Sequence, residues 1–192
     1  NGLPRGGAQR MLYYLLRDYD RDRFKMSVVS LTELGAVGEQ LRGIDVEVRA
    51  LNMNRMLPSP IKFQSLITQL RKERTDVVQT WLYHGDLIGG LAGRLAGAPV
   101  LWNLRQSDLD PRTTKKFTML TAKACALLSR RIPHGIVCCS QASQRVHAEL
   151  GYLSTGMLVI SNGVDIDMFQ PDKTSASALR QEFGIQPYSP LI

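Results

Sequence analysis

Cysteine is scarce in the sequence, and its three copies form no recognisable pattern. Cys125, Cys138 and Cys139 have neither CxxC nor Cys/His ligand spacing, so the sequence predicts neither a disulfide framework nor a zinc site, and we expect no bound metal. A reducing compartment is therefore the expected environment. Long apolar runs are lacking too. The most apolar stretch, 87–102, is interrupted by an arginine and a proline, whereas a bilayer span needs roughly 20 apolar residues.

A secretory signal is also absent from the sequence as given. It opens with Asn1-Gly2-Leu3-Pro4-Arg5, which is typical of a loop, and it has no initiator methionine. These residues lack the charged and apolar regions of a signal peptide. We therefore expect the sequence to begin inside a longer protein.

Acidic residues are fewer than basic ones. The 192 residues include 24 Lys and Arg against 17 Asp and Glu, a net charge of +7. This charge favours anionic partners such as phosphates, acidic lipid surfaces or nucleic acid. Hydrophobic residues make up 44% and charged residues 21%, an ordinary globular composition that can bury a core. The length suits one domain with a small appendage.

Predicted strands and helices alternate along the chain. The strands are expected at 24–30, 46–51, 76–82, 99–104, 135–140 and 157–161, and helices are expected to begin after Gly6 and near positions 36, 60, 87, 114, 142 and 175. Several strands are apolar without alternation, which is typical of a parallel sheet covered on both faces. We predict an α/β fold, a Rossmann-like three-layer domain with a mainly parallel sheet. Because nothing before Gly6 resembles a strand, the first strand of that sheet is expected to be missing.

A long helix predicted over 114–131 carries an apolar stripe and a row of basic residues. The stripe, which is expected to face the core, consists of Phe117, Leu120, Ala124, Leu127 and Leu128. Opposite much of that stripe, every seventh residue is basic: Lys116, Lys123 and Arg130. Such a face suits an anionic membrane or a diphosphate-lipid head group, and a solvated helix face is the plainer alternative. Nucleic acid is disfavoured, because no aromatic residues alternate with these charges.

Four residues mark a candidate acceptor- or phosphate-binding site at one edge of the predicted sheet. Gly6 and Gly7 lie at a helix N-terminus, where exposed backbone N–H groups bind phosphate well. His84 follows the third predicted strand and Arg105 follows the fourth, and ligands of open α/β sheets bind at these carboxyl ends. Each residue alone has a plainer interpretation. These are a flexible turn for the glycines, a helix start for His84, and an ion pair with a nearby aspartate for Arg105.

The glycine pattern fits neither of two common nucleotide-binding motifs. The spacing from Gly2 to Gly7 matches a P-loop, yet Ala8-Gln9 stands where Lys and Ser/Thr belong, and G-x-G-x-x-G is absent. A P-loop ATPase is therefore disfavoured, and a nucleotide-dependent dehydrogenase is a weaker option. No Ser/His/Asp order or paired-carboxylate spacing supports a hydrolase, and no catalytic residue is assigned.

Four segments of the chain carry a family resemblance. They are 6–10 (GGAQR), 76–81 (DVVQTW), 91–100 (LAGRLAGAPV), and 159–171, which contains Asn162-Gly163-Val164-Asp165 and ends in Phe169-Gln170-Pro171. Taken in this order, they resemble the N-terminal half of family 4 glycosyltransferases. The last segment is the most specific, and in that family it lies where the first Rossmann-like domain passes to the second. The resemblance covers nearly the whole chain.

This resemblance implies a GT-B fold, in which two Rossmann-like domains face each other across a cleft. Residues 1–171 would be the N-terminal, acceptor-binding domain, and 172–192 the linker and the start of a C-terminal donor-binding domain, with a strand beginning at Pro190. The implied reaction is retaining transfer of a sugar, of the hexosyltransferase type, from a nucleotide-sugar donor to a lipid-linked or polysaccharide acceptor. No cofactor is expected, because the donor is a substrate bound mainly by the C-terminal domain. This chain alone is expected to be inactive.

The resemblance also implies roles for the candidate residues. Gly6 and Gly7 would bring backbone N–H groups toward the donor diphosphate or the acceptor, and His84 would line the acceptor side of the cleft. Arg105 stands where many relatives have a histidine, so we expect it to hold a phosphate or carboxylate of the acceptor. The expected location is the cytoplasm, at the inner face of the membrane, in cell-envelope polysaccharide synthesis. The alternative to an enzyme is a non-catalytic α/β module that binds an anionic ligand or a protein partner.

Overall fold

The computed structural model describes residues 2–54, 59–110, 112–186 and 189–190. The chain divides into two compact units, Asn1–Asn162 and Gly163–Ile192. This division falls inside the Asn-Gly-Val-Asp segment, before the boundary expected after residue 171. The strand expected from Pro190 falls mostly on residues 191–192, which lie outside the described residues.

The second unit holds helix α8 (Lys173–Glu182). The helix begins after Asp172, whose carboxylate accepts hydrogen bonds from the backbone amides of Thr174 and Ser175. This is the usual way in which an aspartate satisfies the first amides of a helix. The helix expected near position 175 is therefore confirmed.

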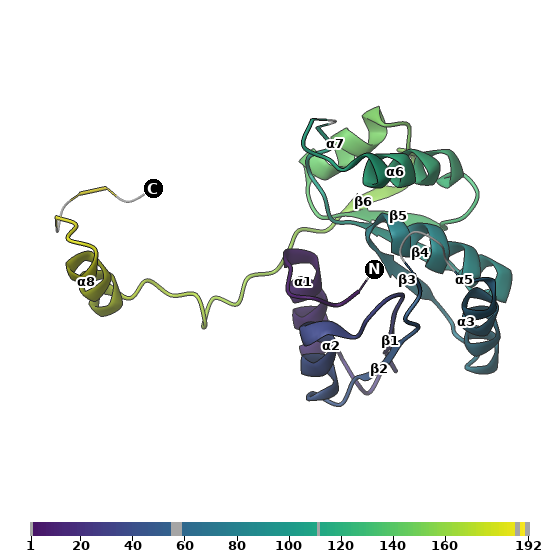
Figure 1. Ribbon diagram of the computed structural model, residues 1–192, viewed down its shortest axis with the longest axis horizontal. Helices are drawn as coiled ribbons and strands as arrows, with labels where there is room; N and C mark the ends of the chain where they lie inside the picture. Colours follow the sequence, from purple (N-terminus) through teal and green to yellow (C-terminus); the bar gives the residue numbers. More distant parts are fainter. Residues whose placement is uncertain (1, 55–58, 111, 187–188, 191–192) are drawn as a thin grey trace. The chain divides into compact units, whose positions relative to one another are not determined.

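Six strands among the described residues form two all-parallel sheets within the first unit (Figure 1). One sheet pairs β1 (Ser27–Ser30) with β2 (Glu47–Ala50), and the other has the order β3 (Val78–Trp81), β4 (Val100–Leu104), β5 (Gly135–Cys138) and β6 (Met157–Val159). In β4 the side chains of Val100, Trp102 and Leu104 are completely buried, as expected of a central strand between two layers. The predicted parallel strands are confirmed, divided between two sheets.

The helices pack on the two sides of these strands. In the first unit they are α1 (Gly7–Arg17), α2 (Gly35–Arg42), α3 (Pro60–Lys72), α4 (Leu82–His84), the π-helix η1 (Gly85–Gly89), α5 (Gly90–Ala96), α6 (Lys116–Leu128) and α7 (Gln141–Glu149). Helix α1 packs with α2, and α3 packs with α5. Figure 1 shows these two pairs on opposite sides of β1 and β2, with α6 and α7 beside β5 and β6. This layering is the predicted Rossmann-like three-layer arrangement.

Local sequence explains where several helices begin. Helix α3 has Pro60 at its first position, and the hydroxyl of the preceding Ser59 accepts a hydrogen bond from a first-turn amide. The Ser140 hydroxyl caps α7 by accepting from the Ser143 amide at 3.0 Å. Helix α1 instead follows Gly6, which has no side chain to cap it. The first amides of α1 therefore have no side-chain cap.

Helix α6 turns a different face to the core than its apolar stripe predicts. Its buried residues are Thr121, Ala122, Cys125 and Ala126. By contrast, Phe117, Leu120 and Leu127 are 41%, 64% and 81% exposed. Small side chains let α6 lie close to α4 and η1, which it contacts, and leucines on that face would hold it away. The prediction that the whole stripe faces the core is wrong, and Leu120 and Leu127 share the exposed side with the basic residues.

Two glycines let α5 approach the sheet closely. A Cβ atom at Gly90 would lie 2.7 Å from Nε1 of Trp102, and one at Gly93 would lie 2.9 Å from Cγ2 of Val100. Both distances are shorter than normal contacts in a close-packed interior. Helix α5 can therefore lie directly against the sheet. The helix predicted to begin near position 87 is divided into η1 and α5.

Gly90→Ala is expected to lower the free energy of unfolding by about 1–3 kcal/mol, because the added methyl group overpacks against Trp102. Gly85→Ala is the matched control. Both glycines have a φ angle of −63°, but a Cβ atom at Gly85 would meet its nearest neighbour at 4.0 Å. Urea denaturation of the two variants measures the difference, and equal stabilities would contradict the close contact.

Candidate functional site

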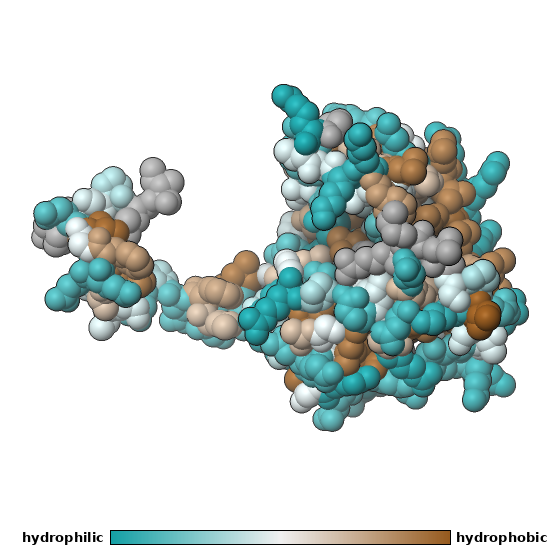
Figure 2. Space-filling model, in the orientation of Figure 1, coloured by the Kyte–Doolittle hydropathy of each residue, from teal (hydrophilic) through white to brown (hydrophobic). Residues whose placement is uncertain are grey.

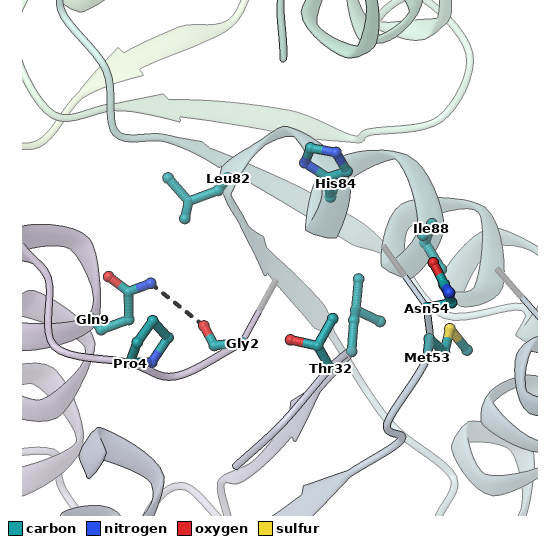
Figure 3. A pocket seen from close by; sticks show the side chains of 10 residues that line it. Gly2, Pro4, Gln9, Thr32, Met53, Asn54, Leu82, His84 and Ile88 are labelled. Carbon is teal, nitrogen blue, oxygen red and sulfur yellow. Dashed lines mark hydrogen bonds between the residues drawn. The ribbon is translucent and has the colours of Figure 1, made fainter. Parts of the chain in front are cut away.

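A pocket of about 230 Å³ lies at the carboxyl ends of β1, β2 and β3 (Figure 3). Its lining comes from the segment before α1, from α1, from the loops after β1 and β2, and from α4 and η1: Gly2, Pro4, Gln9, Leu31, Thr32, Met53, Asn54, Leu82, His84 and Ile88. None of these residues is Asp, Glu, Lys or Arg. This is the sheet edge at which α/β folds bind ligands, and an apolar lining with a few polar groups is typical of a binding site.

The Thr32 hydroxyl is a polar group of this pocket that can bind a ligand. Its Oγ1 is buried and has no hydrogen-bond partner among the residues that the structure describes. Figure 3 shows this oxygen directed toward Gly2, and a Cβ atom at Gly2 would lie 2.6 Å from it. A buried, unpaired hydroxyl costs about 1–3 kcal/mol, which a hydrogen bond from a ligand would recover. Sequence reasoning missed Thr32, although it follows the first predicted strand much as His84 follows the third.

A sharp turn at the end of β3 places His84 beside the pocket. Leu82 has a φ of 66°, in the left-handed region that costs a bulky residue roughly 1–3 kcal/mol. Helix α4 begins at this residue, so the chain reverses from strand to helix within one position. The His84 ring also lies 5.4 Å from the Phe117 ring of α6, between centroids. His84 is thus held between the pocket and α6.

Two residues after His84, Asp86 is completely buried in η1. Its Oδ1 lies 2.5 Å from the Thr80 hydroxyl of β3, and its Oδ2 has no hydrogen-bond partner within the described part of the chain. Burial raises the pKa of Asp86 to about 8, although hydrogen bonds from Thr80 and the Asn103 backbone oppose the rise. The carboxyl group is therefore mostly protonated at neutral pH, and its contact with Thr80 ties η1 to β3.

The buried side chain of His147, from α7, contacts Tyr83 of α4. Nε2 of His147 lies 2.7 Å from the Tyr83 hydroxyl, and Nδ1 lies 2.7 Å from the Ser143 carbonyl oxygen. Because a carbonyl can only accept, Nδ1 carries the proton and Nε2 accepts from Tyr83. Burial lowers the pKa of His147, which favours this neutral form. The Cys125 thiol of α6 donates to the Tyr83 carbonyl at 3.4 Å, so Tyr83 is fixed directly before His84.

Arg105 lies at the end of β4 and is not among the residues that line the pocket. Its guanidinium stacks on Trp81, 4.7 Å from the ring centroid. It also donates to Oδ1 of Asn103 at 3.4 Å and to Oδ1 of Asn162. Arg105 therefore joins the ends of β3 and β4 to Asn162, the last residue of the first unit, a contact that sequence reasoning did not foresee. Its role in holding a phosphate or carboxylate stays a prediction.

The other predicted site residues also lie outside the pocket lining. Gly6 and Gly7 are exposed at the start of α1. Gln9, from the same first turn, does line the pocket, and its Nε2 donates to the Gly2 carbonyl at 3.4 Å. The basic residues are exposed on α6 and in the turn that follows it: Lys116, Lys123 and Arg130. The structure therefore brings together His84 and the first turn of α1.

Membrane-spanning helices and metal-binding clusters are both absent from the described ranges. No helix there is long and apolar enough to cross a membrane. The same ranges contain no group of three or more His, Cys, Asp or Glu side chains that could hold a metal ion. The cysteines are free thiols, buried at Cys125 and Cys138 and half-buried at Cys139.

Parallel strands between two helical layers, with a pocket at their carboxyl ends, define a Rossmann-like domain, and solved structures contain this domain within a larger fold. Anabaena HepE, solved in complex with UDP-glucose, matches with a TM-score of 0.75 and 23% identity over 95% of this chain and 47% of that chain. MurG from Acinetobacter baumannii matches with a TM-score of 0.55 and 18% identity over 88% of this chain and 46% of that chain. The domain is one half of a GT-B fold, as expected.

Residues 5–168 match the family model of Glycosyltransferase Family 4, and the chain belongs to that family. Among curated proteins, it is similar to UDP-Gal:alpha-D-GlcNAc-diphosphoundecaprenol alpha-1,3-galactosyltransferase of Escherichia coli. The two are 27% identical over 108 residues, which is 56% of this chain and 28% of that protein. The chain spans about half the length of the HepE and MurG structures. The family expected from the sequence motifs is confirmed.

Proposed function

We propose that this chain is the acceptor-binding half of a retaining glycosyltransferase that transfers a hexose from a nucleotide-sugar to a lipid-linked acceptor. The family match over residues 5–168 carries the proposal. HepE was solved with UDP-glucose, and the name of the Escherichia coli relative specifies UDP-Gal and a GlcNAc-diphosphoundecaprenol acceptor. A UDP-hexose and a diphosphate-linked lipid sugar are therefore the first substrates to test, with a polysaccharide acceptor second.

The pocket at the ends of β1, β2 and β3 is the proposed acceptor site. A sugar is neutral, so its hydroxyl groups need hydrogen-bond partners and not counter-ions. The described lining residues include no Asp, Glu, Lys or Arg, and the Thr32 hydroxyl has no hydrogen-bond partner among the described residues; both observations support such a ligand. We propose that His84 makes a second contact, because its ring borders the pocket at the point where β3 ends.

Phosphate groups are the proposed ligands of Gly6, Gly7 and Arg105. The amides at the start of α1 have no side-chain cap, and the positive end of the helix dipole attracts negative charge. The Arg105 guanidinium is already oriented by Trp81 and Asn162, and its planar donors suit a phosphate or carboxylate. The chain by itself is proposed to be inactive and to need no cofactor. It is proposed to act in the cytoplasm, in synthesis of the cell envelope.

A donor screen tests this function in the protein that carries this chain. That protein is incubated with UDP-galactose, UDP-glucose and other nucleotide-sugars as donors, and with undecaprenyl-diphosphate-linked GlcNAc as the acceptor. We expect transfer from at least one UDP-hexose, and NMR of the product is expected to show that the anomeric configuration of the donor is kept. Ligand binding without transfer from every donor would contradict the enzyme and favour a non-catalytic module.

Thr32→Val is expected to raise the KM for the acceptor about three- to tenfold, because valine has the same shape and cannot form the hydrogen bond, worth about 0.5–1.5 kcal/mol. The KM for the nucleotide-sugar is expected to stay unchanged. Thr68→Val on α3, whose hydroxyl donates to the Gln64 carbonyl in its own helix, is the control. A change in donor KM alone would show that this pocket does not bind the acceptor.

A further inference from the structure

Helix α6 exposes an alternating row of basic and large apolar side chains. The row is Lys116, Leu120, Lys123, Leu127 and, in the turn after the helix, Arg130. Steps of four and three residues place these side chains on one side of a helix. All five are exposed, Leu127 by 81%, and Figure 2 shows apolar residues at the surface over α6. The core does not explain these leucines, because α6 buries its opposite side.

An anionic lipid bilayer is the partner whose chemistry fits this row. Helices that lie in a membrane interface combine leucine and phenylalanine with lysine and arginine. Helix α6 contains no Asp or Glu, and two further cations, Lys115 and Arg131, flank it. Such cations are attracted to acidic head groups, while the leucines between them can reach the acyl boundary. A second copy of the chain fits poorly, because pairing two such rows sets cation against cation.

Phe117 connects this row with the pocket. It lies in the first turn of α6, is 41% exposed, and its ring centroid is 5.4 Å from that of His84. His84 in turn lines the pocket. A ligand anchored in the bilayer beneath α6 would therefore reach the pocket past Phe117, without leaving the membrane surface.

We propose that the exposed row of α6, together with Phe117, docks in the interface of an anionic bilayer and holds the pocket at the membrane surface. The docking itself stands on the exposure and charge of α6. Its use, which is to present the pocket to a lipid-linked acceptor, rests on the proposed function. The two parts can therefore fail separately.

Vesicle sedimentation tests the contribution of the leucines. The full chain is mixed with phosphatidylglycerol-containing vesicles, and Leu120→Ser with Leu127→Ser is expected to lower the partition coefficient at least tenfold. The control is Ile61→Ser with Leu95→Ser, which removes leucine-sized side chains that are 82% and 53% exposed on α3 and α5. We expect wild-type binding from this control. Equal binding by both double variants and the wild type would overturn the docking face.

Charge reversal tests the choice of an acidic surface. Lys116→Glu with Lys123→Glu is expected to abolish binding to phosphatidylglycerol vesicles, and the wild type is expected to bind pure phosphatidylcholine at least tenfold more weakly. The control is Lys25→Glu with Lys72→Glu, which changes the net charge by the same amount at exposed positions outside α6. We expect this control to keep most of the binding. An equal loss in both charge variants would show non-specific attraction by the net charge and would overturn the proposal. Analytical ultracentrifugation gives a second check. A dimer of the wild type that the two leucine changes dissociate would also overturn the proposal.

Transferase assays separate the docking from the proposed function. With the protein that carries this chain, the two leucine changes are expected to lower turnover of a lipid-linked acceptor in vesicles at least tenfold. Turnover of a short-chain, water-soluble analogue is expected to stay within twofold. An equal loss with both acceptors would overturn the role of α6 in presenting the pocket. Absence of activity in the wild type with either acceptor would contradict the proposed function and leave the vesicle result standing.

Discussion

Asp86→Asn is expected to become steadily more stable than the wild type as the pH rises from about 4 to 8. The pKa of Asp86 is raised by burial from 3.8 to about 8 in the folded protein. Between these values the folded state keeps a proton that the unfolded state releases, so wild-type stability falls as the pH rises. The slope from one such group is about 1.4 kcal/mol per pH unit. Asparagine is neutral at every pH and lacks this loss.

Chemical denaturation at several pH values measures this difference between the variant and the wild type. His147 acts in the opposite direction: its lowered pKa means that stability is lost as the pH falls through its ordinary value of 6.5. This contribution is shared by both proteins and cancels in the difference. Asp22→Asn, at an exposed position, is the control and is expected to run parallel to the wild type. If the free energy of unfolding of Asp86→Asn instead changed with pH in parallel with that of the wild type, Asp86 would be ionised in the folded state.

His84→Ala is expected to lower kcat/KM for the acceptor by about tenfold to a hundredfold, the loss that follows removal of a strong hydrogen bond to a bound ligand. The domain is expected to stay folded, because the neighbouring Tyr83 remains fixed by His147 and Cys125. Steady-state kinetics of the protein that carries this chain, with the acceptor varied, provide the measurement.

The control for this variant is His134→Gln. His134 precedes β5 at the opposite end of the strands, and its Nδ1 accepts a hydrogen bond from the Val100 amide. We expect nearly wild-type turnover from this change. Wild-type turnover in His84→Ala would show that the acceptor does not use this edge of the sheet. A large loss in both variants, accompanied by lower stability, would point to folding and not to the site.

Much of the fold follows from local sequence, whereas the packing of α6 does not. The alternation of apolar strands with helices, and the Ser59-Pro60 start of α3, locate elements to within a few residues. Periodicity cannot decide which of two faces is buried when both carry apolar atoms. On α6 the core face is made of small residues such as Ala122 and Cys125. Only the neighbouring elements show that a close approach is needed there.

The candidate site was also only partly predictable, because burial depends on neighbouring elements and not on local sequence. The rule that ligands bind at strand carboxyl ends finds His84, and applied to β1 and β2 it would also have found Thr32 and Asn54. Asp86 could not be recognised, because an aspartate in an apolar helix looks like any surface carboxylate until its burial is known. Its raised pKa is a property of the tertiary structure and not of the neighbouring sequence.

Because the described lining of the pocket contains no Asp, Glu, Lys or Arg, the two proposed binding events should respond differently to salt. Salt largely screens the attraction between exposed charges that are more than about 8 Å apart at physiological ionic strength and more than about 3 Å apart at 1 M, but it acts much less on hydrogen bonds to a neutral sugar. Concentrated salt should therefore release α6 from acidic vesicles while leaving a soluble acceptor bound beside Thr32 and His84. Ionic strength would then separate the proposed docking of α6 from the proposed binding of the acceptor's sugar.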